Sequence, residues 1–257
     1  MGTLPPHGPR APDDRDPRER LLREIAAEMR ATGASTGEPT LDPRVADALR
    51  RVPRERFVPP DLEARAWDNA PLPIGKGQTI SQPFIVALMT QLLHPAPHHR
   101  VLEVGAGSGY QAAVLAELVD HVVTLERIAA LAEAARRRLA ELGYANVEVH
   151  VADGHAGWPA RAPYDGILVA AAAHEVPEAL VEQLAPGGRL VIPVGGDWGQ
   201  ALVLVEKDEA GGVTRRSVLP VAFVPMLDGL DGVPALPEEA TGDAAGRRGN
   251  GKEAGET

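Results

Sequence analysis

Glycines and carboxylates are the residues best placed to do chemistry in this 257-residue chain. In the segment Val101–Tyr110 a short apolar stretch is followed by three glycines and a predicted helix, the glycines being Gly105, Gly107 and Gly109. Glycines at the carboxyl end of a strand let a ligand approach the backbone where the next helix begins. The pattern predicts a site for a nucleotide-type ligand, although a tight strand-to-helix turn would use the same glycines.

The spacing of these glycines and the presence of Glu103 distinguish between ligands. The loop has the pattern G-x-G-x-G, whereas dinucleotide-binding loops have G-x-G-x-x-G. A carboxylate at the strand end would repel a pyrophosphate but could accept hydrogen bonds from a cationic aminoacyl group. The loop therefore favours S-adenosylmethionine as the ligand.

Two further carboxylates follow neighbouring predicted strands. Glu126 ends the next strand, where a carboxylate can accept hydrogen bonds from both ribose hydroxyls. Asp153, followed by Gly154, comes after the third strand, in position to accept from an adenine amino group. Each has a simpler alternative, because Glu126 could cap the following helix and Asp153 could be an ordinary turn residue. Features at the ends of three successive strands together favour the nucleoside interpretation.

The elements that must position these residues alternate between strand and helix from residue 101 onward. Strands are predicted at 101–105, 122–126, 147–151, 166–170 and 189–194, and helices at 110–118, 128–142 and 176–184. This alternation predicts a doubly wound, mainly parallel α/β sheet of the Rossmann-like type. Strands at 201–207 and 217–224 have only a charged turn between them, so we expect an antiparallel hairpin at the edge of a seven-stranded sheet.

Residues before the sheet predict a small helical layer. The segment 20–30 has apolar residues at helical spacing and is interrupted by 33–39, and Pro43 begins a second short helix through Leu49. Further along, Ser81 is predicted to cap an apolar helix that has Pro83 in its first turn. A catalytic triad is disfavoured, because no G-x-S-x-G motif surrounds this serine.

Composition sets the domain limits. Residues 1–18 and 228–257 are poor in large apolar residues, so we expect disordered tails, the second of them acidic. A single domain is expected at 19–227, with N-terminal helices and an active-site loop at 19–95 and the α/β core at 96–227.

Composition also excludes several functional classes. The formal net charge of -10 disfavours nucleic acid and anionic membranes as partners. The chain has no cysteine, which excludes disulfide scaffolds, thiolate zinc sites and cysteine nucleophiles. No stretch approaches the roughly 20 apolar residues that span a bilayer, and the N-terminus lacks the apolar core of a secretory signal. We therefore expect a cytoplasmic protein.

Several segments resemble one enzyme family, the protein-L-isoaspartate (D-aspartate) O-methyltransferases. The resemblance extends from about residue 20 to Met226 and is carried by PRERFV at 53–58, PLPIG at 71–75, GQTISQP at 77–83 and VLEVGAGSGYQAA at 101–113. Many methyltransferases share such a glycine loop, but GQTISQP is specific to this family. The run from Met226 to Gly229 replaces a polar residue found in several members, so the resemblance assigns no C-terminal contacts.

The resemblance implies a repair enzyme that methylates the free α-carboxyl of L-isoaspartyl and D-aspartyl residues. S-adenosylmethionine is the implied methyl donor, S-adenosylhomocysteine its product, and the ester formed closes to a succinimide. The implied catalytic residue is Ser81, and no metal is implied. The implied cofactor-binding residues include the glycine loop. They are Gln78, Thr79, Ile80, Ser81, Glu103, Gly105, Ala106, Gly107, Gly109, Glu126, Arg127, Asp153 and Gly154. Isoaspartyl-containing proteins and peptides are the implied partners, and we expect a monomer.

The chemistry assigns Ser81 a positioning role. A carboxylate already carries its nucleophilic charge, so the enzyme needs mainly to align the reacting atoms and exclude water. Ser81 is expected to orient the carboxylate by hydrogen bonding. Two alternatives stay open: a methyltransferase that esterifies a normal aspartate in one dedicated peptide, and a module that binds the cofactor without turnover.

Three other groups have simpler interpretations. His94, His98 and His99 lack a carboxylate at metal-ligand spacing and are interpreted as a polar loop. The arginines at 136–138 lie among glutamates and are interpreted as a solvated helix face. Trp67 either borders the substrate cleft, as the resemblance implies, or anchors a loop.

Overall fold

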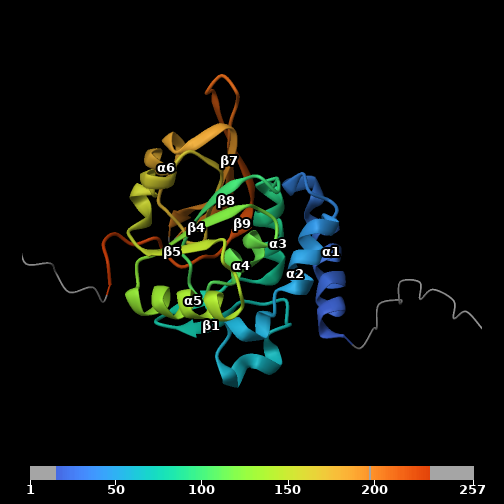
Figure 1. Ribbon diagram of the computed structural model, residues 1–257. Coiled ribbons are helices and arrows are strands. Elements are labelled where there is room, and N and C mark those ends of the chain that lie inside the picture. The colour runs from blue at the N-terminus through green and yellow to red at the C-terminus, as the bar shows by residue number, and fades with distance from the viewer. Residues whose placement is uncertain (1–15, 197, 232–257) are drawn as a thin grey trace, which may run out of the picture.

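The computed structural model describes residues 16–231 apart from residue 197 and contains one seven-stranded sheet flanked by helices (Figure 1). The strand order is β5-β4-β3-β6-β7-β8-β9. The bounds are β3 (Arg100–Val104), β4 (His121–Glu126), β5 (Val147–Val151), β6 (Tyr164–Val169), β7 (Leu184–Gly196), β8 (Gly199–Lys207) and β9 (Val213–Val221). Strands β3 to β7 are parallel, whereas β8 and β9 form an antiparallel hairpin at the edge. The predicted fold class and edge hairpin are confirmed.

Both faces of the sheet are buried, as is typical of parallel sheets. Alternate residues of one strand enter different cores: Val101 packs with the N-terminal helices, and Leu102 packs with α6. The helices are α1 (Pro17–Thr36), α2 (Pro43–Arg51), α3 (Pro83–Leu92), α4 (Tyr110–Ala116), α5 (Ala129–Glu141) and α6 (Glu178–Glu182). Side chains at the strand ends are therefore fixed by packing on both sides.

The N-terminal layer differs from the prediction in the length of its first helix. Helix α1 continues through Gly33, where the sequence predicted a break, and ends at Gly37 in the left-handed conformation with φ 80°. A Cβ at Gly33 would lie 2.7 Å from Pro39, so this glycine allows close packing inside the helix. The helix therefore ends within the predicted interruption at 33–39, but at Gly37 and not at Gly33, because a glycine can serve packing as well as termination.

A second difference lies between the helical layer and the sheet. Strands β1 (Leu72–Gly75) and β2 (Gln78–Ile80) form an antiparallel hairpin where only a loop was expected. Two short 3-10 helices, η1 (Arg54–Phe57) and η2 (Pro60–Arg65), precede it, and two more, η3 (Gly154–Ala156) and η4 (Pro159–Arg161), follow β5. The strands of the hairpin are three to four residues long, too short for periodicity to show.

The C-terminal boundary also differs. Residues 228–231 were expected to belong to a tail, yet they hydrogen-bond to the domain. The Arg127 guanidinium donates to the carbonyl of Gly229 at 3.1 Å, and the amide of Ala129 donates to that of Asp231 at 3.0 Å. Residues 228–231 take part through their backbone groups, which the amino-acid composition of the segment does not report. The N-terminal boundary differs as well, because Asp16 to Arg18 were expected in the tail but form the N-cap and the first residues of α1. The remaining parts of the expected tails, 1–15 and 232–257, lie outside the described residues.

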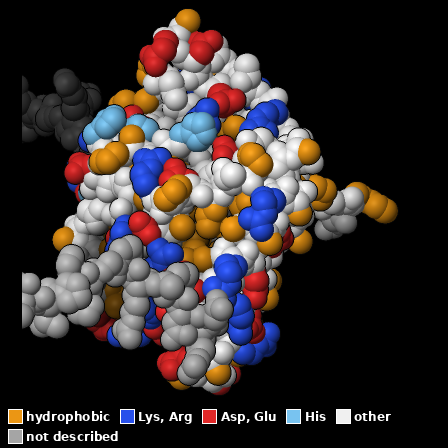
Figure 2. Space-filling model, turned by 90° about the vertical axis from the view of Figure 1, so that its right-hand side faces the viewer, with side chains coloured by type: hydrophobic (Ala, Val, Ile, Leu, Met, Phe, Trp, Pro, Cys, Tyr) orange, Lys and Arg blue, Asp and Glu red, His pale blue; other side chains and the backbone are white. Residues whose placement is uncertain are grey.

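The surface carries charges of both signs. On the face shown in Figure 2, Lys and Arg side chains are interspersed with Asp and Glu around an apolar patch. Arg136 and Arg137 pair with Glu133, as predicted, whereas Arg138 turns inward and donates to the carbonyl of Ser108 at 2.7 Å. Within residues 16–231 no helix combines the length and the apolar character that crossing a membrane requires.

Candidate active site

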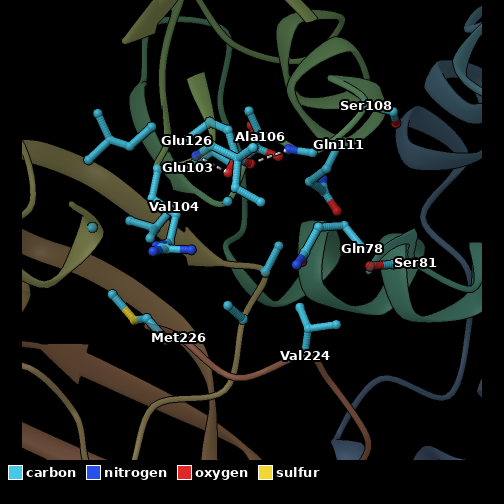
Figure 3. A pocket seen from close by; sticks show the side chains of 18 of the residues that line it. Gln78, Ser81, Glu103, Val104, Ala106, Ser108, Gln111, Glu126, Val224 and Met226 are labelled. Atoms are coloured by element: carbon cyan, nitrogen blue, oxygen red, sulfur yellow. Dashed lines mark hydrogen bonds between the residues drawn. The ribbon is translucent and has the colours of Figure 1, made fainter. Parts of the chain in front are cut away.

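A cavity with about 880 Å³ of empty space lies at the carboxyl ends of β3, β4 and β6. Its walls come mainly from segments 78–81, 103–108, 125–128, 170–171 and 224–227. In Figure 3 Glu103 and Glu126 lie close together, with Met226 and Val224 below them. The position is the one at which open α/β sheets bind ligands.

Glu103 is a fully buried carboxylate in the wall of this cavity. One oxygen, Oε2, accepts a short hydrogen bond from the Thr124 hydroxyl of the neighbouring strand, and the other, Oε1, has no partner within the described residues. Burial raises the pKa of Glu103 to about 8, the Thr124 hydroxyl lowers it in part, and the charge of Glu126 raises it. An unpartnered carboxylate oxygen suits a cationic ligand group.

Glu126 organises the glycine loop. Its Oε2 accepts from the amide of Gly107 at 2.9 Å, and its Oε1 accepts from the amide of Ile128 at 2.9 Å. Each carboxylate oxygen can accept more than one hydrogen bond, so the side chain can still receive hydroxyl donors from the cavity. Glu126 does not cap α5, whose N-cap is Ile128 without a side-chain cap, but its bonds to the loop leave it able to contact a ligand.

The hairpin β1–β2 lies against the glycine loop. Gly107 has φ 53°, and a Cβ there would lie 3.3 Å from the Cδ1 of Ile74. The loop therefore needs a glycine both for its backbone conformation and for contact with the hairpin. This packing brings segment 78–81 over the cavity.

Ser81 does not cap the following helix. Helix α3 begins at Pro83 with Gln82 as its N-cap, and no side chain caps it. The Ser81 hydroxyl has no hydrogen-bond partner within the described residues, while the buried Arg54 donates to the Ser81 carbonyl at 2.9 Å. The predicted capping role was wrong, and the hydroxyl is available to a ligand.

Asp153 anchors the C-terminal segment. Its Oδ2 accepts from the amide of Gly229 at 2.7 Å, and its Oδ1 accepts from the amide of His155 at 2.9 Å. Burial alone would raise the pKa of Asp153, but these amides and the His155 ring together lower it. Asp153, His155 and Asp228 place possible ligand atoms within 4.8 Å of one another, and the hydrogen bonds account for their grouping.

The C-terminal segment forms the wall that sequence reasoning missed. Residues 224–227 line the cavity, and the amide of Met226 donates to the carbonyl of Ala172 at 2.8 Å. Ala170 and Ala171, which follow β6, line it as well. The strand predicted at 166–170 could have indicated these two alanines. The sequence pattern gave no signal for residues 224–227, and the resemblance placed 226–229 near the cofactor in related proteins without assigning contacts to them.

A second cavity, with about 1050 Å³ of empty space, adjoins the first. The residues common to both walls are Thr79, Ser81, Ala170 and Val224. The remaining lining is mainly apolar and carries one charged side chain, Glu28, which accepts from the Asn69 amide at 2.9 Å. Ser81 therefore stands at the boundary between the first cavity and a neighbouring cleft.

Most of the predicted cofactor residues line the first cavity. They are Gln78, Thr79, Ile80, Ser81, Glu103, Gly105, Ala106, Gly107, Glu126, Arg127 and Gly154. Asp153 and Gly109 do not line it: Asp153 bonds to the C-terminal segment, and Gly109 packs against Leu139 of α5. Trp67 is buried under the Arg18 guanidinium and lines neither cavity, which agrees with the loop-anchor interpretation.

The chain is similar to known proteins over most of its length. Residues 34–231 match the sequence profile of the family described as protein-L-isoaspartate(D-aspartate) O-methyltransferase. A protein-L-isoaspartate O-methyltransferase 2 of Syntrophobacter fumaroxidans is 55% identical over 213 residues, which is 82% of this chain and 86% of the relative. One of the same name from Polaromonas sp. is 56% identical over 207 residues, covering 80% and 98%.

Solved structures agree on the fold. A protein-L-isoaspartate O-methyltransferase aligns with a TM-score of 0.71 and 28% identity, covering 83% of this chain and 67% of the other. A putative enzyme of that name from Plasmodium falciparum, solved with S-adenosyl-L-homocysteine, aligns with a TM-score of 0.65 and 24% identity, covering 80% and 98%.

Proposed function

The chain belongs to the protein-L-isoaspartate(D-aspartate) O-methyltransferase family, and we propose that Ser81 positions the substrate carboxylate for that family's reaction. The activity is transfer of a methyl group from S-adenosylmethionine to the free α-carboxyl of isoaspartyl residues in damaged proteins. The ester has a better leaving group than the carboxylate. The neighbouring backbone nitrogen therefore displaces methanol and closes a succinimide, whose hydrolysis returns some normal aspartyl linkage.

The residues of the first cavity fit the cofactor. When bound, S-adenosylmethionine supplies an electrophilic methyl group on a sulfonium. The unpartnered Oε1 of Glu103 would accept from its ammonium, and Glu126 would accept from its ribose hydroxyls. Ala152 and Gly154 line the wall beyond β5, where the apolar side chain of Met226 would cover an adenine ring. Asp153, expected to accept from the adenine amino group, would instead contribute indirectly, because it holds the segment that supplies Met226.

The second cavity fits a peptide. Its apolar lining and its opening beside Ser81 provide room for the residues that flank an isoaspartyl linkage. The observation that carries the proposal is the available Ser81 hydroxyl at the boundary of the two cavities. From there, it can donate to the substrate carboxylate and orient one oxygen toward the cofactor cavity.

A pair of synthetic peptides tests the proposal, one with an L-isoaspartyl and one with a normal L-aspartyl linkage. With labelled S-adenosylmethionine, base-labile methyl ester should form on the isoaspartyl peptide alone. Label on the normal peptide would indicate the dedicated peptide-modifying alternative. Cofactor binding without label on either peptide would favour the non-catalytic module.

Ser81→Ala isolates the role of the hydroxyl. Loss of one hydrogen bond to a charged group should lower kcat by roughly 10- to 100-fold while cofactor affinity changes little. Ser217→Ala, on the exposed part of β9, serves as the matched control and should keep full activity. Unchanged initial rates in Ser81→Ala would reject the positioning role.

We further propose that the enzyme acts as a monomer in the cytoplasm, with isoaspartyl proteins and peptides as its macromolecular partners. The net charge of -10 supports proteins and peptides as the partners, because it repels nucleic acid and anionic membranes. We also infer that Pro17 to Asp231 folds as one unit, since both ends hydrogen-bond to the domain.

A further inference from the structure

Arg54 is a fully buried arginine whose contacts reach both the active-site loop and the glycine loop. It lies in η1 with no exposed surface, and no carboxylate in the described part of the chain forms an ion pair with it. Burying a cation without a counter-charge is costly, and burial lowers the pKa of this guanidinium. Packing alone does not explain why an arginine, and not an apolar residue, occupies this buried position.

The guanidinium binds the backbone of the segment that carries Ser81. Its Nη2 donates to the carbonyl of Ser81 at 2.9 Å and to that of Ala70 at 3.5 Å, and its Nε donates to that of Ala66 at 2.8 Å. These carbonyls lie before and after the β1–β2 hairpin. One planar group thus joins the two ends of the hairpin.

The face of the same guanidinium covers an aromatic ring at the cofactor cavity. Its Cζ lies 4.7 Å from the ring centre of Tyr110, which begins α4 directly after the glycine loop and lines the first cavity. Tyr110 is itself held edge-on by Phe57 of η1 at 5.5 Å between ring centres. Arg54 therefore connects the backbone of Ser81 to the element that follows the cofactor loop.

We propose that Arg54 is a positioning residue that fixes the Ser81 backbone relative to the cofactor cavity, so that the Ser81 hydroxyl meets the substrate carboxylate in line with the methyl group. Ser81 lies between β2 and α3, outside regular structure, and its own side chain makes no bond that would hold it. The Arg54 contact is the hydrogen bond that restrains its carbonyl. A shift of about 1 Å at such a residue is enough to slow a positioned reaction by roughly 100-fold.

Two substitutions at this position separate positioning from simple stability. Arg54→Met keeps an apolar stem and removes the buried charge, but it leaves the carbonyls of Ala66 and Ser81 without this donor, which costs some stability. Arg54→Lys keeps the charge but replaces the planar fork with a point donor. Arg56→Met, two residues along η1 on an exposed arginine paired with Glu141, is the matched control.

The measurements are kcat at saturating isoaspartyl peptide, cofactor Kd by calorimetry, the melting temperature, and hydrogen–deuterium exchange of segment 79–84. We expect Arg54→Met to lose at least tenfold in kcat, with cofactor Kd changed less than threefold and faster exchange in 79–84. Arg54→Lys should recover part of kcat, and Arg56→Met should match the wild type. If Arg54→Met fails to fold, Arg54→Lys carries the test with the same readouts.

The inference is overturned if a folded Arg54 variant keeps wild-type kcat and wild-type exchange in 79–84. It is equally overturned if kcat and cofactor affinity fall in proportion with the melting temperature, since that marks a structural role alone. The proposal rests on the function assigned to Ser81, so Ser81→Ala is measured in parallel. Full activity of Ser81→Ala would reject that function, whereas an inactive Ser81→Ala beside a fully active Arg54→Met would reject the present inference only.

Discussion

Replacing Glu103 with glutamine should stabilise the ligand-free protein and weaken its binding of cofactor. The carboxylate is fully buried, one of its oxygens has no partner, and its pKa rises from 4.5 to about 8. Each pKa unit corresponds to about 1.4 kcal/mol, so the ionised form is disfavoured in the fold by about 5 kcal/mol. Glutamine keeps the shape and can still accept from Thr124 without carrying charge.

The sign of the pH dependence follows from which state holds the proton. Between pH 4.5 and about 8 the unfolded chain has released the Glu103 proton, while the folded protein keeps it. The free energy of unfolding of the wild type should therefore fall relative to Glu103→Gln by about 1.4 kcal/mol per pH unit. The difference should be close to zero near pH 4.5, about 3 kcal/mol near pH 7, and constant above pH 8.

Urea unfolding of ligand-free protein near pH 5, 7 and 8.5 measures this difference directly. Glu182→Gln, on an exposed glutamate at the end of α6, is the control and should show no such trend. Calorimetry should show cofactor affinity roughly 10- to 100-fold weaker in Glu103→Gln, because a charged hydrogen bond is lost. A stability difference that does not change with pH, or unchanged cofactor affinity, would refute the argument.

Three smaller predictions concern the walls of the two cavities. Gly154→Ala should destabilise the fold by about 1–3 kcal/mol and weaken cofactor binding, because a Cβ there would lie 2.1 Å from Val104; thermal melting with and without cofactor measures both. Asp153→Asn should release the segment around Gly229, seen as faster proteolysis after Met226 and weaker cofactor binding; an unchanged cleavage rate would contradict this. Glu28→Gln should lower the KM of isoaspartyl peptides with an acidic neighbour by about two- to fivefold without altering that of neutral peptides, which steady-state assays with matched peptides test.

The local sequence pattern was sufficient to predict the sheet, the glycine loop and the edge hairpin. Strand, glycine loop and helix at 101–110 form as predicted, and Glu103 and Glu126 reach the cavity because parallel strands bring their carboxyl ends to one edge. The charged turn between two strands without a helix predicted the antiparallel edge hairpin. These features depend on periodicity and on residues close in sequence, so the sequence reports them directly.

Ser81 shows where local pattern fails. A serine two residues before a helical proline is a good N-cap by propensity, yet Gln82 occupies that position and the serine hydroxyl remains available. Arg54, 27 residues earlier in the chain, donates to the Ser81 carbonyl at this point. A contact over that separation is outside the range of a local capping pattern.

The sequence by itself determined the fold class, the glycine loop and the acidic partners of that loop. Only the tertiary structure decided that segment 224–227 closes the cofactor cavity, that Asp153 holds this segment in place, and that Ser81 stands between two cavities. The physical reason is the range of the interactions. Periodicity encodes burial and backbone conformation within a few residues, whereas these contacts join residues far apart in the chain, and only packing of the complete sheet and its helices brings them together.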